Sequence, residues 1–370
     1  MTEKNTICLS AVLRRSFLKQ STSLAIGTGI CSPFTSGKSL ELSTDLKTPL
    51  TSFLVAGDTH FLAKKEEPDK MDPRSLEICG RLVASMNQLP GSVIPEPSGG
   101  GLVRKPDGLI HTGDIIDTGD KNGTVQEQMQ QTEWNAFVQE YGLHGSDGRL
   151  RYPVYEVFGN HDAPHGRGLV LEKIQARNKT RPNVMHVSSN GLHYSWNWGN
   201  AHFINLGIIV GAEKSVSRRR RYAALDSLEF LVSDLHSHVG DSGRPVIITH
   251  HIDVSRYMGA CDTHKPADSQ EWDSCDVQAY YRALNGYRIA AIFYGHTHVR
   301  DVFRWDGISK NATTGLNVFN ADNASHFGGD AQAFFYVELF EEQIIVREFM
   351  TKNGWKSGAF SPHFWMRTFS

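Results

Sequence analysis

Apolar, strand-like runs that end in metal-ligand types of side chain, most often after a glycine, recur along this sequence. The first run covers residues 53–56 and leads into Gly57-Asp58-Thr59-His60. Buried strands of an open α/β sheet read as short apolar runs, and polar residues at their carboxyl ends gather at one edge of the sheet. The pattern therefore predicts an α/β fold with a polar site at that edge.

Four more runs end in the same way, at residues 109–112, 154–158, 245–249 and 289–294. The polar residues that follow the five runs are Asp58 and His60, Asp114 and Asp117, Asn160, His161 and Asp162, His250 and His251, and His296 and His298. Apolar periodicity predicts helices at about 75–87, 124–141 and 222–236, and alternation predicts strands after residue 299. We expect loops at 163–190 and 252–287. Together these elements predict two packed mixed sheets with helices outside.

The composition fits a globular protein with a sizeable core, at 39% hydrophobic and 21% charged residues. A formal net charge of −2 gives no electrostatic basis for binding nucleic acid or an anionic membrane surface. The sequence shows no apolar stretch long enough for a transmembrane span. It also shows no internal repeat and no composition break after residue 51, so we expect a single domain at 51–370.

The N-terminal segment is expected to direct export. Arg14-Arg15-Ser16-Phe17-Leu18-Lys19 precedes a short apolar run and resembles a twin-arginine signal. We expect a signal peptide at 1–35, a polar linker at 36–50, recognition by the twin-arginine export machinery, and a periplasmic or extracellular location. A basic, disordered N-terminus is the alternative. In an oxidising compartment Cys261 and Cys275 could form a disulfide, whereas Cys79 is expected to be a buried thiol.

The ligand types at the strand ends predict a metal centre. They provide four imidazoles, two carboxylates and one amide, from Asp58, His60, Asp114, Asn160, His250, His296 and His298. One tetrahedral zinc ion cannot use so many donors, but two divalent ions that share a carboxylate can. Nitrogen and oxygen donors without thiolate favour Zn, Mn or Fe. Such a pair, about 3.5–4 Å apart, can hold a phosphoryl oxygen and activate water.

These motifs, in this order, resemble the signature of the calcineurin-like metallophosphoesterases across residues 52–300. The resemblance implies a four-layer αββα sandwich of two mixed β-sheets and the hydrolysis of phosphate esters with two metal ions. It implies one ion held by Asp58, His60 and His298, a second held by Asn160, His250 and His296, and a bridging Asp114.

The resemblance also implies roles around the metals. His161 would stabilise the charged phosphoryl group or protonate the leaving oxygen. Asp117 would hydrogen-bond His161 and orient it, and Asp162 would support the same histidine or a metal ligand. Of the pair His250-His251 we expect His250 to be the ligand, and His251 to face substrate or to pack.

The substrate is less constrained than the reaction. His165, Arg167 and Lys265 are candidates for contact with an anionic substrate, although each also fits a solvated surface. Trp272, Tyr280 and Tyr281 form either an aromatic wall of the site or part of the core. Export favours a small-molecule or lipid-derived phosphate ester, cleaved as a monoester or a diester. The alternative function is that of a catalytically silent, exported metal-binding envelope protein on the same fold.

Overall fold

The computed structural model describes residues 48–212, 220–257 and 271–369. The chain divides into two units, Met1–Leu46 and Lys47–Ser370, and every described residue belongs to the second. The predicted signal peptide, most of the predicted linker, Cys261 and Lys265 therefore lie outside the described residues. Cys275 is disulfide-bonded, and Cys79 is a buried free thiol, as predicted.

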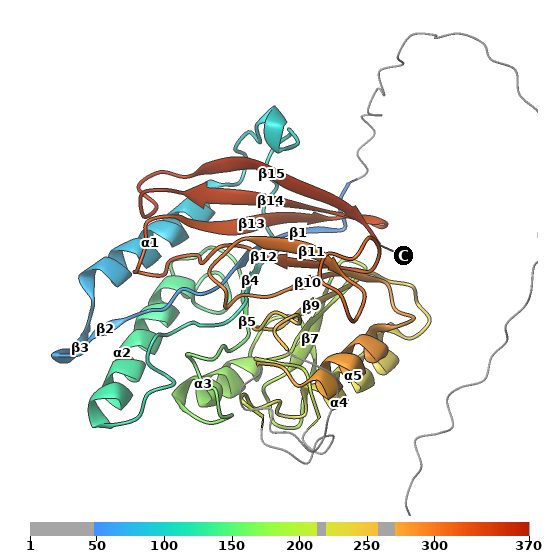
Figure 1. Ribbon diagram of the computed structural model, residues 1–370. Helices are drawn as coiled ribbons and strands as arrows, with labels where there is room; N and C mark the ends of the chain where they lie inside the picture. Colours follow the sequence, from blue (N-terminus) through green and yellow to red (C-terminus); the bar gives the residue numbers. More distant parts are fainter. Residues whose placement is uncertain (1–47, 213–219, 258–270, 370) are drawn as a thin grey trace, which may run out of the picture. The chain divides into compact units, whose positions relative to one another are not determined.

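Two large mixed sheets form the centre of the described unit (Figure 1). The first has the order β15-β14-β13-β1-β4-β5 and the second β11-β12-β10-β9-β8-β7-β6. The first sheet contains β1 (Thr51–Ala56), β4 (Leu109–His111), β5 (Val154–Glu156), β13 (Gln332–Leu339), β14 (Gln343–Thr351) and β15 (Ala359–Thr368). The second contains β6 (Val184–Val187), β7 (Tyr194–Trp198), β8 (Ala201–Asn205), β9 (Val246–Thr249), β10 (Ile289–Phe293), β11 (Asp301–Trp305) and β12 (Leu316–Asn320). A small hairpin of β2 (Ala63–Lys64) and β3 (Glu67–Met71) is separate from both sheets.

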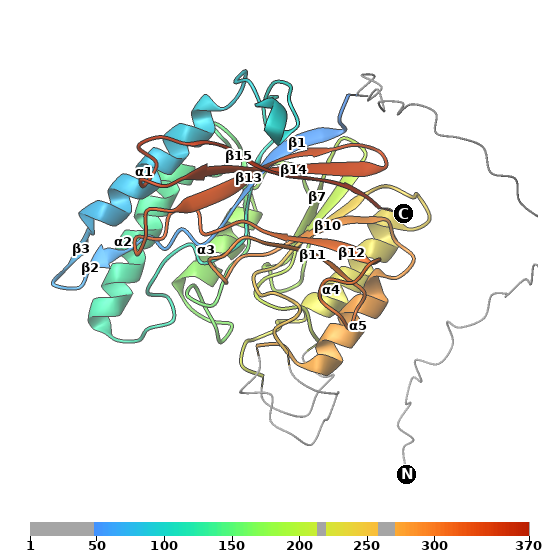
Figure 2. The ribbon, with the colours of Figure 1, turned by 45° about the horizontal axis from the view of Figure 1, so that its top comes forward.

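Helices cover the outer faces of the two sheets. They are α1 (Pro73–Gln88), α2 (Thr124–Tyr141), α3 (Leu169–Asn178), α4 (Ser227–Asp234) and α5 (Ser274–Leu284), with a 3₁₀ turn at Glu96–Ser98 and a π-helical turn at Leu235–Val239. Both ribbon views show α1 and α2 together on one side and α4 and α5 on the other (Figures 1 and 2). The predicted αββα sandwich is confirmed. Among the described residues, no helix is long and apolar enough to cross a bilayer.

The first strand shows how the core is divided between the layers. All of β1 is buried, and its side chains alternate between two apolar clusters. Leu54 belongs to the cluster that includes the helices, whereas Phe53 belongs to the cluster between the sheets. Phe53 contacts Phe203 and Phe293 of the second sheet, with ring centroids 5.3 and 6.0 Å apart. A strand buried on both faces explains why the sequence showed a continuous apolar run.

The expected helices at 75–87 and 124–141 are confirmed, and the helix expected from residue 222 begins at Ser227. The two expected loops were wrong in part, because α3 and β6 lie in the first and α5 lies in the second. Charged and polar side chains are interspersed with the apolar ones along α3, so its apolar periodicity is weak. For α5 a start signal was present: the Asp273 side chain accepts a hydrogen bond from the Cys275 backbone N–H.

A buried ion pair supports β5, the strand that leads to Asn160. The carboxylate of Glu156 is fully buried and accepts hydrogen bonds from Arg181 Nη2 at 2.6 Å and from Arg177 Nε at 2.7 Å. Burial raises the pKa of Glu156, but the two guanidinium groups outweigh it and lower this pKa from its ordinary 4.5 to about 2. The ionised carboxylate is therefore the form that stabilises the fold.

We predict that Glu156→Gln lowers the free energy of unfolding by about 3–5 kcal/mol at neutral pH, because Arg181 stays buried without its anion. Since folding depresses the pKa of Glu156, this stabilisation is present above pH 4.5 and is lost as pH falls towards 2. Urea titrations at pH 7 and pH 3 should thus show a smaller difference between variant and wild type at pH 3. Glu77→Gln, which changes an exposed pair with Arg81, is the control and should have little effect. Equal losses at both pH values would contradict this account.

Candidate metal centre

The predicted ligands come together where the two sheets meet at the carboxyl ends of their parallel strands. In the first sheet β1, β4 and β5 run parallel, and in the second β8, β9, β10 and β12 do. Two sets of side chains have ligand atoms within 4.8 Å of one another and share one aspartate: Asp58, His60, Asp114 and His298, and Asp114, His251 and His296. The shared Asp114 makes this one site with two halves.

The first half brings two imidazole nitrogens into direct apposition. His60 Nε2 lies 3.1 Å from His298 Nε2, and it lies 3.6 Å from Asp114 Oδ2. Asp117 Oδ1 lies 3.3 Å from His60 Nδ1, which favours a proton on Nδ1 and leaves the Nε2 lone pair directed into the site. Two lone pairs at this distance repel unless a proton or a cation lies between them. The donor set therefore fits a divalent ion.

The second half is centred on His251. Its Nδ1 donates a hydrogen bond to the carbonyl oxygen of Thr112 at 2.8 Å. Its Nε2 lies 3.2 Å from Asp114 Oδ2 and 3.1 Å from Asn160 Oδ1. The carbonyl fixes the tautomer, so the Nε2 lone pair is directed at these two oxygens. This half also fits a divalent ion, with Asp114 Oδ2 between His60 and His251.

His250, the predicted ligand, packs among aromatic side chains instead of lying beside Asp114. Its ring packs against Trp272 and Tyr280, with centroids 5.3 and 5.5 Å apart, and neither ring nitrogen has a hydrogen-bond partner among the described residues. Burial lowers the pKa of His250 to about 3, so the ring is neutral. Successive side chains at a strand end point to opposite faces, and the structure places His251 on the side of Asp114. Trp272 and Tyr280 are fully buried, so they belong to the core and not to an aromatic wall of the site.

The backbone carries strain at the candidate ligands. Five of them have a positive φ, between 44° and 74°: Asp58, His60, Asp114, His296 and His298. A left-handed conformation is unfavourable for side chains of these types and persists only where the surroundings hold it in place. Such outliers are concentrated at functional sites, and here they coincide with residues that the sequence had already singled out.

The glycines of the motifs permit close approach of the loops. A Cβ on Gly57 would lie 1.9 Å from Thr112 Oγ1, and a Cβ on Gly159 would lie 2.2 Å from Asp114 Oδ1. No side chain fits at such distances. The glycines at these two positions thus let neighbouring strand ends pack closely around the ligands.

Asp162 connects two of the ligand loops. Its buried carboxylate accepts hydrogen bonds from the backbone N–H groups of Ile115 and Ile116 at 3.0 Å each and of Gly159 at 2.7 Å. Ile115 follows Asp114, and Gly159 precedes Asn160. Asp162 therefore positions the backbone that carries two candidate ligands, Asp114 and Asn160.

The contact between His161 and Asp117 differs from the predicted side-chain hydrogen bond. The side chain of His161 is 34% exposed. Its Nδ1 lies 3.3 Å from the backbone carbonyl of Asp117 and 3.8 Å from Asp120 Oδ1. The Asp117 carboxylate instead lies next to His60, and Lys121 Nζ donates to it at 2.9 Å. The hydrogen bond between Asp117 and His161 thus runs through the Asp117 main chain, although the Asp117 carboxylate also lies within 4.8 Å of a His161 ring nitrogen.

Charge in the site is balanced between buried carboxylates and imidazoles. Burial raises the pKa of Asp114, but His251 and His60 lower it well below its ordinary value. Burial lowers the pKa of His251, but Asp114 and Asp58 raise it to about 9. The buried carboxylates of the site therefore require positive charge beside them. A cation at the same place supplies that charge directly.

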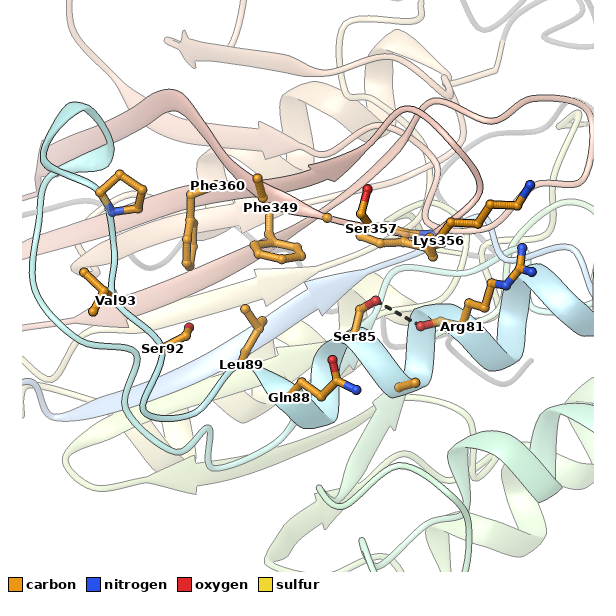
Figure 3. Close-up of a pocket in the computed structure, with 15 residues that line it drawn as sticks. Arg81, Ser85, Gln88, Leu89, Ser92, Val93, Phe349, Lys356, Ser357 and Phe360 are labelled. Carbon is orange, nitrogen blue, oxygen red and sulfur yellow. Dashed lines mark hydrogen bonds between the residues drawn. The ribbon is translucent and has the colours of Figure 1, made fainter.

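Two cavities help to locate a substrate. One, of about 380 Å³, is lined by Asp120, Lys121, His165 and Arg167 among others, and it adjoins the centre through Asp120 beside His161. A larger one, of about 480 Å³, lies between α1 and the β14–β15 hairpin (Figure 3). Its lining has aromatic side chains and two cations but no histidine or carboxylate. The chemistry therefore points to the smaller cavity, which is lined by His165 and Arg167, two of the three described residues predicted to contact substrate; the third, His251, lies beside Asp114 instead.

Two further residues near the centre did not stand out in the sequence. Glu271 Oε1 lies 3.1 Å from His296 Nε2, and the same carboxylate pairs with Arg256. His326 forms a third ligand-like group with His60 and His298. A signal for His326 existed, because it follows the apolar strand β12 as the candidate ligands follow their strands, but it lies beyond residue 300, where the recognised motifs end.

The arrangement predicts opposite results for the two adjacent histidines. His251→Phe should lower the bound metal from about two ions per chain to about one, because it removes the nitrogen ligand that lies beside the Asp114 carboxylate. His250→Phe, its matched control, should keep the metal content, since a phenyl ring fits among Trp272 and Tyr280. Elemental analysis of the folded variants measures both. Loss of metal in His250→Phe with retention in His251→Phe would reverse the assignment.

Comparison with known proteins supports the family resemblance of the sequence motifs. The family model described as calcineurin-like phosphoesterase matches residues 51–300, more than half of the chain. Similar solved structures include a dimetal phosphatase from Danio rerio (13% identity, 87% of this chain and 100% of that chain, TM-score 0.49). They also include a phosphopantetheinyl hydrolase from Mycobacterium tuberculosis (10% identity, 74% and 89%, TM-score 0.31). None of the curated proteins matches significantly.

Proposed function

Because the chain belongs to the calcineurin-like phosphoesterase family, we propose that it hydrolyses phosphate esters with two divalent metal ions bound where its sheets meet. The observation that carries this proposal is the position of Asp114 Oδ2, 3.6 Å from His60 Nε2 and 3.2 Å from His251 Nε2. One carboxylate oxygen between two imidazole lone pairs is the arrangement of a bridging ligand.

The donors divide between the two ions as follows. Asp58, His60, Asp114 and His298 would hold the first, and Asp114, Asn160, His251 and His296 the second. When bound, the ions act as Lewis acids towards the phosphoryl group and lower the pKa of the attacking water. Asp117, Thr112 and Glu271 contact ring nitrogens of His60, His251 and His296 and so fix these rings. The donor set accepts Mn, Fe or Zn.

His161 is the proposed proton donor to the leaving oxygen. Its Nδ1 faces the Asp117 carbonyl oxygen, and the Asp120 carboxylate lies 3.8 Å from the same nitrogen, so these acceptors hold a proton on Nδ1. The protonated ring carries its second proton on Nε2. The partly exposed side chain can deliver that proton to a bound ester. Asp162 does not touch this ring in any described contact and acts on the ligand loops.

We also propose that the cavity of about 380 Å³ beside His161 receives the leaving group. His165, Arg167 and Lys121 supply positive or hydrogen-bonding groups, and Asp120 and Glu172 supply negative ones. A lining of mixed charge favours a small polar phosphate ester over one with a lipid tail. Monoester and diester are both compatible with this cavity.

Hydrolysis of p-nitrophenyl phosphate and bis-p-nitrophenyl phosphate, with Mn, Zn or Fe added, tests this function. Wild type should turn over at least one of them with about two metal ions per chain. His161→Ala should keep the metal and lose roughly 100-fold or more in rate. The exposed His144→Ala is a control and should behave as wild type. A fully metallated wild type that cleaves neither substrate would instead support the silent metal-binding envelope protein.

Export by the twin-arginine route is also part of the proposal, supported by the Arg14-Arg15 motif. This route carries folded proteins, which suits a centre that takes up metal before export. Replacing both arginines by lysine should retain the protein in the cytoplasm, as measured by cell fractionation of the expressing bacterium. Unchanged export of the double variant would contradict this route.

A further inference from the structure

His326 lies at the metal centre without belonging to any of the five motifs. Its ring centroid is 4.8 Å from that of His60 and 4.9 Å from that of His298. His161 also lies 4.8 Å from the ring of His60, but it groups with Asp117, whereas His326 groups with His298. Two histidines that are not assigned ligands therefore flank the first half of the centre, each in a different group around His60.

The loop that carries His326 is attached to the loop that carries Asp58 and His60. The Ala324 backbone N–H donates to the Gly57 carbonyl at 2.9 Å, and Ser325 Oγ donates to the Thr59 carbonyl at 3.2 Å. Asn323 Oδ1 accepts from the His326 backbone N–H at 3.0 Å. These contacts hold His326 beside the centre through hydrogen bonds within the fold, independently of any metal.

The hydrogen bonding of the ring decides what His326 can do. The Gly328 backbone N–H donates to His326 Nδ1 at 3.0 Å, so Nδ1 is an acceptor and the ring proton resides on Nε2. A nitrogen that carries a proton has no lone pair for a metal. His326 is thus a hydrogen-bond donor at the edge of a site whose other imidazoles present lone pairs. His161 has the reverse arrangement, because its Nδ1 faces a carbonyl.

From this we infer that His326 is a substrate-contacting residue, which donates its Nε2–H to a phosphoryl oxygen of the bound ester and of the phosphate product. The inference rests on the proposed function, since it assumes that the phosphoryl group lies at the centre. It assigns the two flanking histidines separate tasks. His161 holds a proton for the leaving oxygen, while His326 stabilises the phosphoryl oxygens without giving up its proton.

Binding of inorganic phosphate to the metal-loaded protein, measured by calorimetry, tests this role. His326→Ala should keep about two metal ions per chain and weaken phosphate binding roughly 10-fold or more, as expected for a lost hydrogen bond to a charged group. His326→Gln supplies an amide N–H at a similar reach and should recover part of the affinity. His144→Ala removes an exposed imidazole that belongs to none of the ligand-like groups, and it is the control.

Two results would overturn the inference. Loss of metal in His326→Ala would make His326 a ligand, and unchanged phosphate affinity with retained metal would leave it without contact to the substrate. Turnover of p-nitrophenyl phosphate separates the two proposals. If wild type binds phosphate in a His326-dependent way but cleaves no ester, the contact stands and the proposed hydrolysis fails. If wild type cleaves esters and His326→Ala binds phosphate normally, only the contact fails.

Discussion

The buried carboxylate of Asp114 is the interaction on which this site depends. It follows β4 of the first sheet, yet it lies 3.2 Å from His251, which follows β9 of the second. The distance exists only while the two sheets stay packed through rings such as Phe53, Phe203 and Phe293. A small slip between the sheets would separate the two halves of the centre. The aromatic layer between the sheets therefore sets the geometry of the site as well as the stability of the fold.

The strained backbone at the ligands is held by ordinary hydrogen bonds around it. Asp58 N–H donates to the Gly113 carbonyl at 2.9 Å, and Asp58 Oδ1 accepts from the His296 backbone N–H at 2.8 Å. Asp162 joins the loops of Asp114 and Asn160 in the same manner. Each loop is thus fixed by its neighbour, so the left-handed residues persist and the candidate ligands are held by hydrogen bonds within the fold.

The tautomer of each imidazole decides whether its free ring nitrogen can bind a cation or donate a hydrogen bond. A carbonyl or a carboxylate beside one ring nitrogen, as for His251 and His60, leaves the other nitrogen free to bind a cation. A backbone N–H beside the ring nitrogen, as for His326, has the opposite effect and makes the other nitrogen a donor. Proximity alone would have counted all of these histidines as ligands. Their hydrogen-bond partners separate metal binding from contact with substrate.

The sequence by itself determined the fold class and most of the candidate ligand set, because strands buried on both faces read as apolar runs and their polar ends must meet at one edge. It pointed to His250 where the structure places His251 beside Asp114, since that choice depends on which way the chain turns after β9. It also could not show that Asp117 contacts His60, that Asp162 bonds to backbone amides, or that His326 joins the site from a loop 266 residues after His60. Most of these contacts join segments distant in sequence. Only the packing of the two sheets and their loops brings such segments within hydrogen-bonding distance.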